Sequence, residues 1–301
     1  MKNDEITINS FRAWVRAARP KTLVAAAVPV LIATSLAWKT DSQAFRVLPM
    51  FLCFLFAFVM QMDANFINDY FDCKRGNDDE TRLGPKRACA EGWVSQRAMM
   101  LAIGIMTILS GVVGFPLVLY GGVEMVAVGA ACILFCFLYT TALSYVAMGD
   151  ILVLLFFGVV PVCCTYYVEL SGTTNPLTNH TFWMSLACGL IIDTLLIINN
   201  YRDYENDRNA GKNTLAVVIG RKAMSLVYLA VVPSALFIGL CCLSFSVSSV
   251  VVSIIILPFH ITTWRRMVVI GEGRELNNIL GKTSRNILLY GILTSMAIIL
   301  S

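Results

Sequence analysis

Two clusters of carboxylates and carboxamides stand out in a chain that has few charged residues. One reads NFINDYFD and contains Asn68 and Asp72, and the other reads NNYRDYEND and contains Asn199, Asp203 and Asp207. Each cluster directly follows a long apolar run. The two align with Asn68 on Asn199 and with Asp72 on Asp203. The same short pattern therefore closes two apolar segments, which suggests two half-sites that face one cavity.

The spacing within each cluster places its oxygen groups on one side of a helix. Residues four apart share a helix face, so Asn68 aligns with Asp72, and Asn199 aligns with Asp203 and Asp207. Carboxylate and amide oxygens suit Mg²⁺, which takes one or two carboxylates, keeps several waters and completes its coordination with substrate phosphates. Two such faces that converge from two helices predict a magnesium site.

Basic residues follow both clusters and extend this prediction to a phosphate ligand. Arg82, Lys86 and Arg87 follow the first cluster, and Lys212 follows the second. A metal held by carboxylates, with cations behind it, is an arrangement that suits a diphosphate. Acidic, Asn-rich segments also occur as solvated helix ends, but the repeated pattern and the basic followers favour the diphosphate site.

The composition excludes a water-facing surface around this site. Hydrophobic residues make up 57% of the 301 residues and charged residues only 14%, with a mean hydropathy of +0.73. Soluble domains carry about 25% charged residues, so a soluble enzyme, a disordered protein and a secreted disulfide scaffold are excluded. The net charge of +4 is too small to indicate a nucleic-acid partner. We predict an integral protein of the lipid bilayer, with one domain over residues 1–301.

Nine apolar runs are long enough to cross a bilayer as helices, which need about 17–25 residues. The runs are continuously apolar, unlike the alternating segments of a membrane β-barrel. The predicted fold is all-α, with nine transmembrane helices bundled around a central cavity that opens to the cytoplasmic side. Prolines within the spans, such as Pro116 and Pro161, are expected to mark kinks. The predicted spans are Thr22–Trp38, Val47–Ile67, Met99–Leu119, Val123–Thr141, Ile151–Leu170, Phe182–Ile198, Met224–Phe245, Val247–Trp264 and Thr283–Leu300.

Lysine and arginine fall almost entirely on one side of these spans. Of the 23 Lys and Arg residues, only Lys39 and Arg46 lie on the other side. Cytoplasmic loops are enriched in these residues, so we predict a cytoplasmic N-terminus and an outside C-terminus in the inner (plasma) membrane. Within the cytoplasmic segment of residues 1–21, Phe11 and Trp14 are expected on the apolar face of a short interfacial helix.

Several stretches resemble the UbiA superfamily of intramembrane prenyltransferases, and the resemblance covers nearly the whole chain. They are most similar to its 1,4-dihydroxy-2-naphthoate polyprenyltransferase branch. Many members place a second aspartate four residues after the first, where this chain has Gly76, whereas the resembled branch keeps Gly-x-Asp, which corresponds to Asp78. The similar stretches are RPKTL at 19–23, NDYFD at 68–72, RLGP at 82–85, FFG at 156–158, NNYRD at 199–203 and GKNTLAV at 211–217.

The resemblance implies Mg²⁺-dependent transfer of a polyprenyl group from a polyprenyl diphosphate to 1,4-dihydroxy-2-naphthoate. CO₂ and diphosphate are lost, and the product is demethylmenaquinone. The implied metal ligands are Asn68, Asp72, Asp78, Asp203 and Asp207. The implied catalytic residues are Asn68, Asp72, Asp203, Asp207 and Lys212. Residues implied to bind diphosphate, or to orient the ligands, are Arg82, Lys86, Arg87, Asn65 and Asn199.

Two alternative functions remain open. A protein of the same superfamily could use another acceptor, such as 4-hydroxybenzoate, haem, a chlorophyllide or a glycerol phosphate lipid. A secondary transporter could use the intramembrane Asp63 and Asp193, but transporters place their binding sites near the bilayer midplane, whereas the carboxylates here crowd the cytoplasmic ends. The roles of Asp63, Asp150 and Asp193 stay open. Tyr139 either lines the acceptor cavity or anchors the membrane interface.

Overall fold

The computed structural model describes residues 6–76, 82–172 and 177–301, and helices dominate throughout these residues. Nine helical stretches of the described residues are long and apolar enough to cross a membrane, which confirms the predicted number. They are formed by α1 with α2, α3, α4 with α5, α6, α7 with α8, α9, α12, α13 and α14. The elements are α1 (Phe11–Ala18), η1 (Pro20–Thr22), α2 (Leu23–Thr40), α3 (Val47–Arg75), α4 (Gln96–Gly114), η2 (Phe115–Leu117), α5 (Val118–Gly121), α6 (Glu124–Thr141), η3 (Leu143–Tyr145), α7 (Gly149–Leu154), η4 (Leu155–Val159), α8 (Val160–Glu169), α9 (Asn179–Arg202), α10 (Tyr204–Asn209), α11 (Leu215–Ile219), α12 (Arg221–Cys242), α13 (Val247–Ile270) and α14 (Leu276–Leu300).

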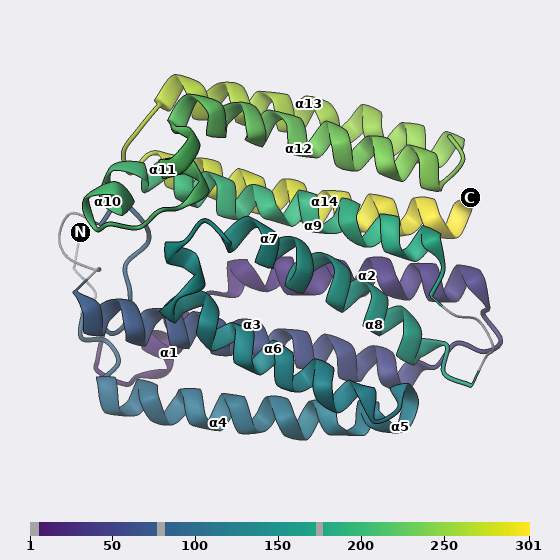
Figure 1. Cartoon of the computed structure of the whole chain (residues 1–301), viewed down its shortest axis with the longest axis horizontal. Helices are drawn as coiled ribbons and strands as arrows, with labels where there is room; N and C mark the ends of the chain where they lie inside the picture. The colour runs from purple at the N-terminus through teal and green to yellow at the C-terminus, as the bar shows by residue number, and fades with distance from the viewer. Residues whose placement is uncertain (1–5, 77–81, 173–176) are drawn as a thin grey trace.

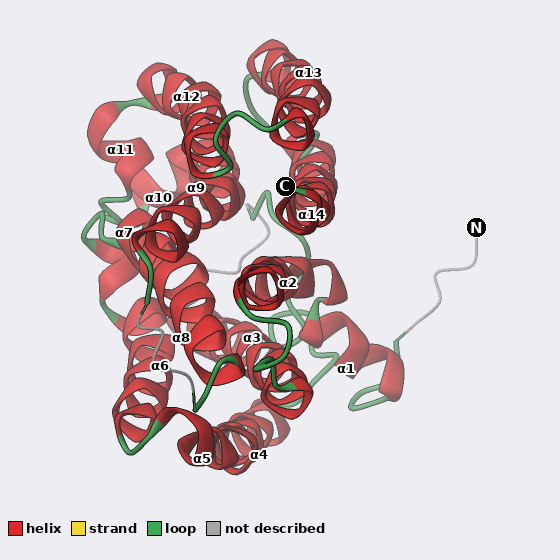
Figure 2. Ribbon diagram, turned by 90° about the vertical axis from the view of Figure 1, so that its right-hand side faces the viewer, coloured by secondary structure: helices red, strands yellow, loops and turns green. Residues whose placement is uncertain are grey.

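The long helices run side by side along the longest axis of the molecule (Figure 1). α12 and α13 lie on one side of the bundle and α4 and α5 on the other, with α2, α3, α9 and α14 between them (Figure 2). The short helices α10 and α11 lie at one end of the bundle, and α14 finishes at the opposite end (Figure 1). The second acidic cluster, which leads into α10, therefore lies at the end opposite the C-terminus.

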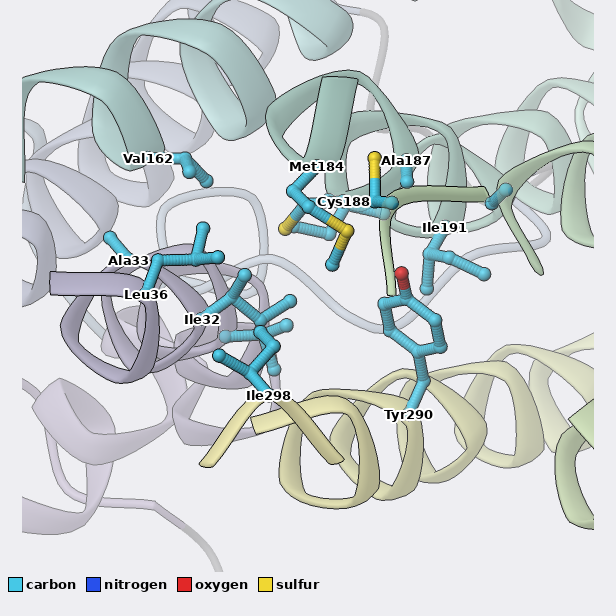
Figure 3. Packing of buried hydrophobic residues seen from close by; sticks show 14 of the residues in the cluster. Ile32, Ala33, Leu36, Val162, Met184, Ala187, Cys188, Ile191, Tyr290 and Ile298 are labelled. Atoms are coloured by element: carbon cyan, nitrogen blue, oxygen red, sulfur yellow. The ribbon is translucent and has the colours of Figure 1, made fainter. Parts of the chain in front are cut away.

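The main hydrophobic core lies between α2, α9 and α14 (Figure 3). Ile32, Met184 and Tyr290 are fully buried in it, one from each of these helices. The outer helices, in contrast, expose large apolar side chains: Ile108 of α4 is 70% exposed and Leu134 of α6 is 55% exposed. Such a surface requires lipid rather than water. The protein is therefore a multi-pass membrane protein.

Two of the span prolines interrupt their helices, whereas Pro29, Pro233 and Pro258 lie inside helices that continue through them. Pro116 lies in the 3₁₀ turn η2 between α4 and α5, and Pro161 follows the π-helical turn η4 at the start of α8. Proline has no N–H to donate and its ring clashes with the carbonyl four residues earlier, so the regular α-helix stops there. Pro161 lines the cavity described below, so this interruption shapes its wall.

Both helices that carry the acidic clusters run further than their apolar segments. α3 ends at Arg75 rather than at Ile67, and α9 ends at Arg202 rather than at Ile198. Apolarity stops at the edge of the bilayer, but helical hydrogen bonding continues beyond it. The first cluster therefore lies on the last turns of α3, beyond the apolar span that was predicted to end at Ile67. α14 is longer too, since it begins at Leu276.

The N-terminal segment contains the expected short helix, α1, although its faces are turned differently. Ser10 caps the helix, and its hydroxyl accepts a hydrogen bond from the N–H of Ala13 at 3.3 Å. Trp14 packs edge-on against Phe66 of α3, with ring centroids 5.6 Å apart. Phe11 is 85% exposed. Trp14, which was expected on the lipid-facing side with Phe11, instead fixes α1 to the bundle.

Gly158 allows η4 to approach α9 closely, and this approach predicts an effect on stability. A Cβ atom at Gly158 would lie 2.6 Å from the carbonyl oxygen of Ser185 and 2.9 Å from Cα of Gly189. Gly158→Ala is expected to lower stability by about 1–3 kcal/mol through overpacking, measured as a lower Tm in detergent. Gly104→Ala is the control, because a Cβ there meets nothing within 4 Å. Equal Tm values for the two variants would contradict the close approach.

Candidate functional site

The first acidic cluster is carried by the last turns of α3 and is tied to the end of α6. Asn68 accepts a hydrogen bond from the hydroxyl of Thr140. Arg75 donates to the carbonyl oxygens of Thr140 and Thr141, both at 2.9 Å. These carbonyls lie at the C-terminus of α6, where they lack intrahelical partners and a cation is favourable. Asn68 is therefore held in a fixed position relative to α6.

The two aspartates of this cluster make different contacts. Asp72 forms an ion pair with Arg87, with Oδ2 and Nη2 3.2 Å apart. Asp69 accepts hydrogen bonds from the backbone N–H groups of Ala88 and Cys89, each at 3.0 Å. Asp69 is only 1% exposed, so its carboxylate anchors the loop that carries Arg87. The ion pair with Asp72 is the result of that anchoring.

The second acidic cluster continues helical hydrogen bonding past the end of α9. The N–H of Asp203 donates to the carbonyl of Asn199 at 2.9 Å, and the N–H of Asp207 donates to the carbonyl of Asp203 at 2.8 Å. The four-residue hydrogen-bond spacing therefore continues through Asp203, which lies between α9 and α10. Lys212 then donates its N–H to the carbonyl of Asp207 at 2.8 Å. Arg202 binds the Asp203 carboxylate through two hydrogen bonds, at 2.8 and 2.6 Å, the strong bidentate geometry.

The buried guanidinium of Arg202 joins the segments after α3 and α9 to the first turn of α14. Arg202 is 3% exposed, and its Nη1 donates to Oδ1 of Asn277 at 2.9 Å. Asn277 in turn donates its Nδ2 to the carbonyl of Leu83 at 2.8 Å. A Cβ at Gly84 would lie 2.9 Å from Nη2 of Arg202. The connections after α3 and after α9 and the first turn of α14 therefore pack against one side chain.

Carboxylates from both clusters interact electrostatically. The pKa of Asp207 is raised to about 6, chiefly because its carboxyl group is buried. The positive charges of Lys212 and Arg202 lower this pKa, and the negative charges of Asp203 and Asp72 raise it. Asp72 belongs to α3, whereas Asp203 and Asp207 follow α9. The two clusters, far apart in sequence, therefore contribute to one region of negative potential.

Two cations near this region pack on the ring of Tyr145, which lies in the connection after α6. The Lys212 ammonium lies 5.1 Å and the Arg75 guanidinium 5.2 Å from the centroid of the Tyr145 ring. The carbonyl of Tyr145 accepts a hydrogen bond from the N–H of Asn213 at 3.1 Å. The aromatic ring thus holds both cations by cation–π contact, and the backbone contact joins the connections that follow α6 and α10.

A cavity of about 620 Å³ extends into the bundle from the acidic clusters. Asn68, Tyr139 and Asn199 line its polar end, and most of its remaining wall is apolar. On α6 the lining residues run from Met125 to Thr140, a rise of about 22 Å along a helix. The volume is within the range of ligand sites, roughly 300–1,000 Å³. The cavity suits a ligand with a polar head and a long apolar tail.

Other predicted site residues lie away from this region. Asn65 donates its Nδ2 to the carbonyl of Ala18 and to the hydroxyl of Thr22, both at 2.9 Å, and so holds the N-terminal segment to α3. Lys86 pairs with Glu91, Nζ to Oε2 2.6 Å, and its side chain is 67% exposed.

The last of the predicted cations, Arg82, belongs to the packed loop around Gly84. It donates its Nε to the carbonyl of Pro85 at 3.1 Å. A Cβ at Gly84 would lie 3.1 Å from Nη2 of Arg82, so Arg82 and Arg202 approach the same glycine. Arg82 is therefore close to the second cluster, whereas Asp78 lies outside the described residues.

The oxygen groups of the two clusters suit a divalent metal. In residues 6–76, 82–172 and 177–301, no group of three or more His, Cys, Asp or Glu side chains is placed to hold one. Mg²⁺, however, uses one or two carboxylates and takes its other oxygens from water and phosphate. Within the described part of the chain, the Asp207 carboxylate has no hydrogen-bond or ion-pair partner. The carboxylates of Asp72 and Asp203 are near enough to interact with it electrostatically. These hard oxygen groups fit Mg²⁺.

Comparison with known proteins decides the family. The chain matches the UbiA prenyltransferase family over residues 26–277. It belongs to this family. Two UbiA relatives are both named 1,4-dihydroxy-2-naphthoate octaprenyltransferase. The chain is 31% identical to the Haemophilus influenzae protein, over 83% of this chain and 82% of that one. It is 34% identical to the Escherichia coli protein, over 72% of this chain and 71% of that one.

Solved structures of UbiA homologues share the fold at low sequence identity. The apo structure of a homologue from Aeropyrum pernix superposes with a TM-score of 0.68 at 15% identity, covering 92% of this chain and 99% of that one. A homologue from Archaeoglobus fulgidus bound to DMAPP and Mg²⁺ superposes with a TM-score of 0.62 at 15% identity, covering 94% and 99%. The nine-span bundle is therefore the UbiA fold.

Two residues of the site were missed by sequence reasoning. Arg202 directly precedes Asp203, and an arginine beside a predicted metal ligand was the available signal. Asn277 offered no signal, because the last span was predicted to begin only at Thr283. The pattern of either segment does not reveal that the two side chains meet.

Asn277 is predicted to position the second cluster through Arg202. Asn277→Ala leaves a buried guanidinium donor unpaired, which costs about 1–3 kcal/mol, so we expect a lower Tm and a weaker apparent affinity for the diphosphate substrate. The neighbouring Asn278 is exposed, and Asn278→Ala is the matched control. Indistinguishable Tm and KM values for the two variants would refute this role.

Proposed function

We propose that this UbiA family protein transfers a polyprenyl group from a polyprenyl diphosphate to 1,4-dihydroxy-2-naphthoate. The products are demethylmenaquinone, CO₂ and diphosphate. The observation that carries the proposal is the meeting of two acidic clusters at the polar end of an apolar cavity. The diphosphate of the substrate fits beside the acidic clusters, and its isoprenoid tail fits the apolar cavity. The names of the Haemophilus influenzae and Escherichia coli relatives support the naphthoate acceptor.

Mg²⁺ would be held by the oxygen groups of both clusters. The proposed ligands are Asn68, Asp72, Asp78, Asp203 and Asp207. Asn199 lines the cavity beside them and orients the bound groups. When bound, the metal supplies Lewis-acid stabilisation of the departing diphosphate. The Archaeoglobus fulgidus homologue that binds DMAPP and Mg²⁺ supports this choice of ion.

The protein's own cations would bind the diphosphate oxygens. Lys212 is close enough to Asp207 to lower its pKa, and Arg87 contacts Asp72, so each cluster has one cation beside it. Arg82 lies near Arg202 in the packed loop and adds a third. Fixed cations stabilise the negative charge that develops on the leaving group.

The apolar wall of the cavity would hold the prenyl tail and exclude water from the allylic carbon. The electron-rich ring of the acceptor attacks this carbon as the bond to the diphosphate oxygen breaks. The carboxyl group of the acceptor then leaves as CO₂, and the ring becomes aromatic again. Exclusion of water matters because water would otherwise capture the allylic cation.

The clusters are inferred to face the cytoplasm across the inner (plasma) membrane, with the C-terminus outside. This inference rests on the excess of lysine and arginine at their end of the bundle. A secondary transporter has less support, because the family match and the acidic clusters at one end favour prenyl transfer over transport.

The metal assignment predicts the effect of removing one carboxylate from each cluster. Asp72→Ala and Asp203→Ala are each expected to lower transfer by more than about 100-fold, because a metal ligand is lost from either side. The rate is measured with purified protein that still inserts into membranes. Glu205→Ala removes an exposed carboxylate two residues after Asp203 and should leave the rate near that of the wild type. Near-wild-type turnover in either of the first two variants contradicts the assignment.

The acceptor is tested by supplying membranes with a labelled prenyl diphosphate and a panel of acceptors. We expect a labelled product from 1,4-dihydroxy-2-naphthoate, none from 4-hydroxybenzoate, and loss of the product on chelation of Mg²⁺ by EDTA. Prenylation of 4-hydroxybenzoate alone would refute the naphthoate assignment and leave prenyl transfer intact. Product formation that is insensitive to EDTA would refute the metal.

A further inference from the structure

Tyr145, in the connection after α6, contacts one cation from each side of the site, and the proposed metal and diphosphate sites do not use it. The Lys212 ammonium lies 5.1 Å and the Arg75 guanidinium 5.2 Å from the centroid of its ring. Lys212 follows the second acidic cluster, whereas Arg75 is the last residue of α3, the helix that carries the first. One aromatic ring therefore contacts side chains from the segments of both clusters.

The position of this ring is fixed by contacts to α3 and α6. The Tyr145 hydroxyl accepts a hydrogen bond from Nη1 of Arg75 at 3.2 Å. The same guanidinium donates to the carbonyls of Thr140 and Thr141, both at 2.9 Å. Thr140 in turn donates its hydroxyl to Asn68, which lines the polar end of the cavity. Arg75 therefore holds the ring close to the first cluster.

The backbone on both sides of Lys212 is fixed as well. Its own N–H donates to the carbonyl of Asp207 at 2.8 Å, and the N–H of Asn213 donates to the carbonyl of Tyr145 at 3.1 Å. Val146 and Asn213 also form a parallel bridge. Only the side-chain torsions of Lys212 are then left to place its ammonium, and a lysine side chain is flexible. Contact with the ring restricts these torsions.

An aromatic ring holds a cation without neutralising it. Arg87 and Arg202 lie beside the clusters too, but each is paired with a carboxylate, that of Asp72 or that of Asp203. Among the residues that the structure describes, no carboxylate lies within ion-pair distance of the Lys212 ammonium. A ring attracts a cation through its quadrupole and carries no net charge. The full positive charge of Lys212 is therefore left for a phosphate group.

We propose that Tyr145 is a positioning residue for the diphosphate of the substrate, because its ring holds the Lys212 ammonium beside the acidic clusters and leaves the charge of that ammonium available. This inference rests on the proposed function. Lys212 contacts the diphosphate oxygens, and Tyr145 acts on them only through Lys212. A cation that is already in place stabilises the departing diphosphate without reorganisation.

The contact is tested through the electron density of the ring. Tyr145→Phe retains a ring, trifluorophenylalanine at the same position retains its shape but attracts a cation weakly, and Tyr145→Leu removes the ring. The dissociation constant is measured with purified protein, Mg²⁺ and a prenyl thiodiphosphate, an analogue that does not ionise. Tyr145→Leu is expected to raise it by about 3- to 30-fold. Tyr145→Phe should retain most of the affinity, and the trifluoro variant should fall between the two.

A double-mutant cycle tests whether the ring acts through Lys212. Lys212→Met keeps an unbranched side chain and removes its charge. In this background, Tyr145→Leu is expected to change the dissociation constant by less than about twofold, because the two side chains are coupled. Phe259→Leu is the matched control, since it removes a ring that lies 5.4 Å from the Arg285 guanidinium and does not line the cavity. Its dissociation constant should equal that of the wild type.

Two results would each overturn the positioning role and leave the reaction assigned. One is an equal dissociation constant for the phenylalanine and trifluorophenylalanine variants, whose rings have nearly the same shape. This comparison holds even where Tyr145→Leu does not fold. The other is an effect of Tyr145→Leu that persists in full in Lys212→Met. A wild-type protein that does not bind the prenyl thiodiphosphate at all overturns the proposed function instead.

Discussion

Ionic groups are costly in hydrocarbon, and the arrangement of this site follows from that cost. α3 and α9 extend beyond their apolar segments and so carry Asp72 and Asp203 to one end of the bundle. There each aspartate is held by an arginine, Arg87 or Arg202. Asp207 has no such partner in the described part of the chain. A divalent cation and a diphosphate, added together, would complete the charge balance of this end.

For the same reason, the cavity has one polar end and an otherwise apolar wall. Polar lining groups such as Asn68, Asn199 and Tyr139 gather at the end of the cavity nearest the acidic clusters, and apolar side chains form most of the remaining wall. A prenyl diphosphate has the same division, so one substrate can satisfy both parts at once.

The large-scale organisation could be predicted from the sequence, because a long apolar run has few stable positions other than a bilayer. The alignment of Asn199 with Asp203 followed in the same way from the helical period. Contacts between distant segments could not be predicted. Asn65 is only three residues from Asn68, yet it binds Thr22 while Asn68 faces the cavity. Which face of α3 turns inward depends on how α1 and α6 pack against it.

The contacts of the basic side chains could not be predicted from the sequence either. Arg87 was expected behind the metal site, but the anchored loop places it directly on Asp72. Lys86, its neighbour in sequence, turns to the solvent and pairs with Glu91. Neither direction follows from the residue types. Both follow from the hydrogen bonds that Asp69 makes to the loop.

The central claim is that both acidic clusters together bind the metal that contacts one diphosphate. Mn²⁺, which accepts the same oxygen ligands as Mg²⁺ and is visible by electron paramagnetic resonance, tests it directly. With a prenyl diphosphate analogue that cannot ionise, the account predicts bound Mn²⁺ with hyperfine coupling to ³¹P. The coupled signal should disappear in both Asp72→Ala and Asp203→Ala. Bound Mn²⁺ without phosphorus coupling, or a coupled signal that survives in either variant, would contradict the account.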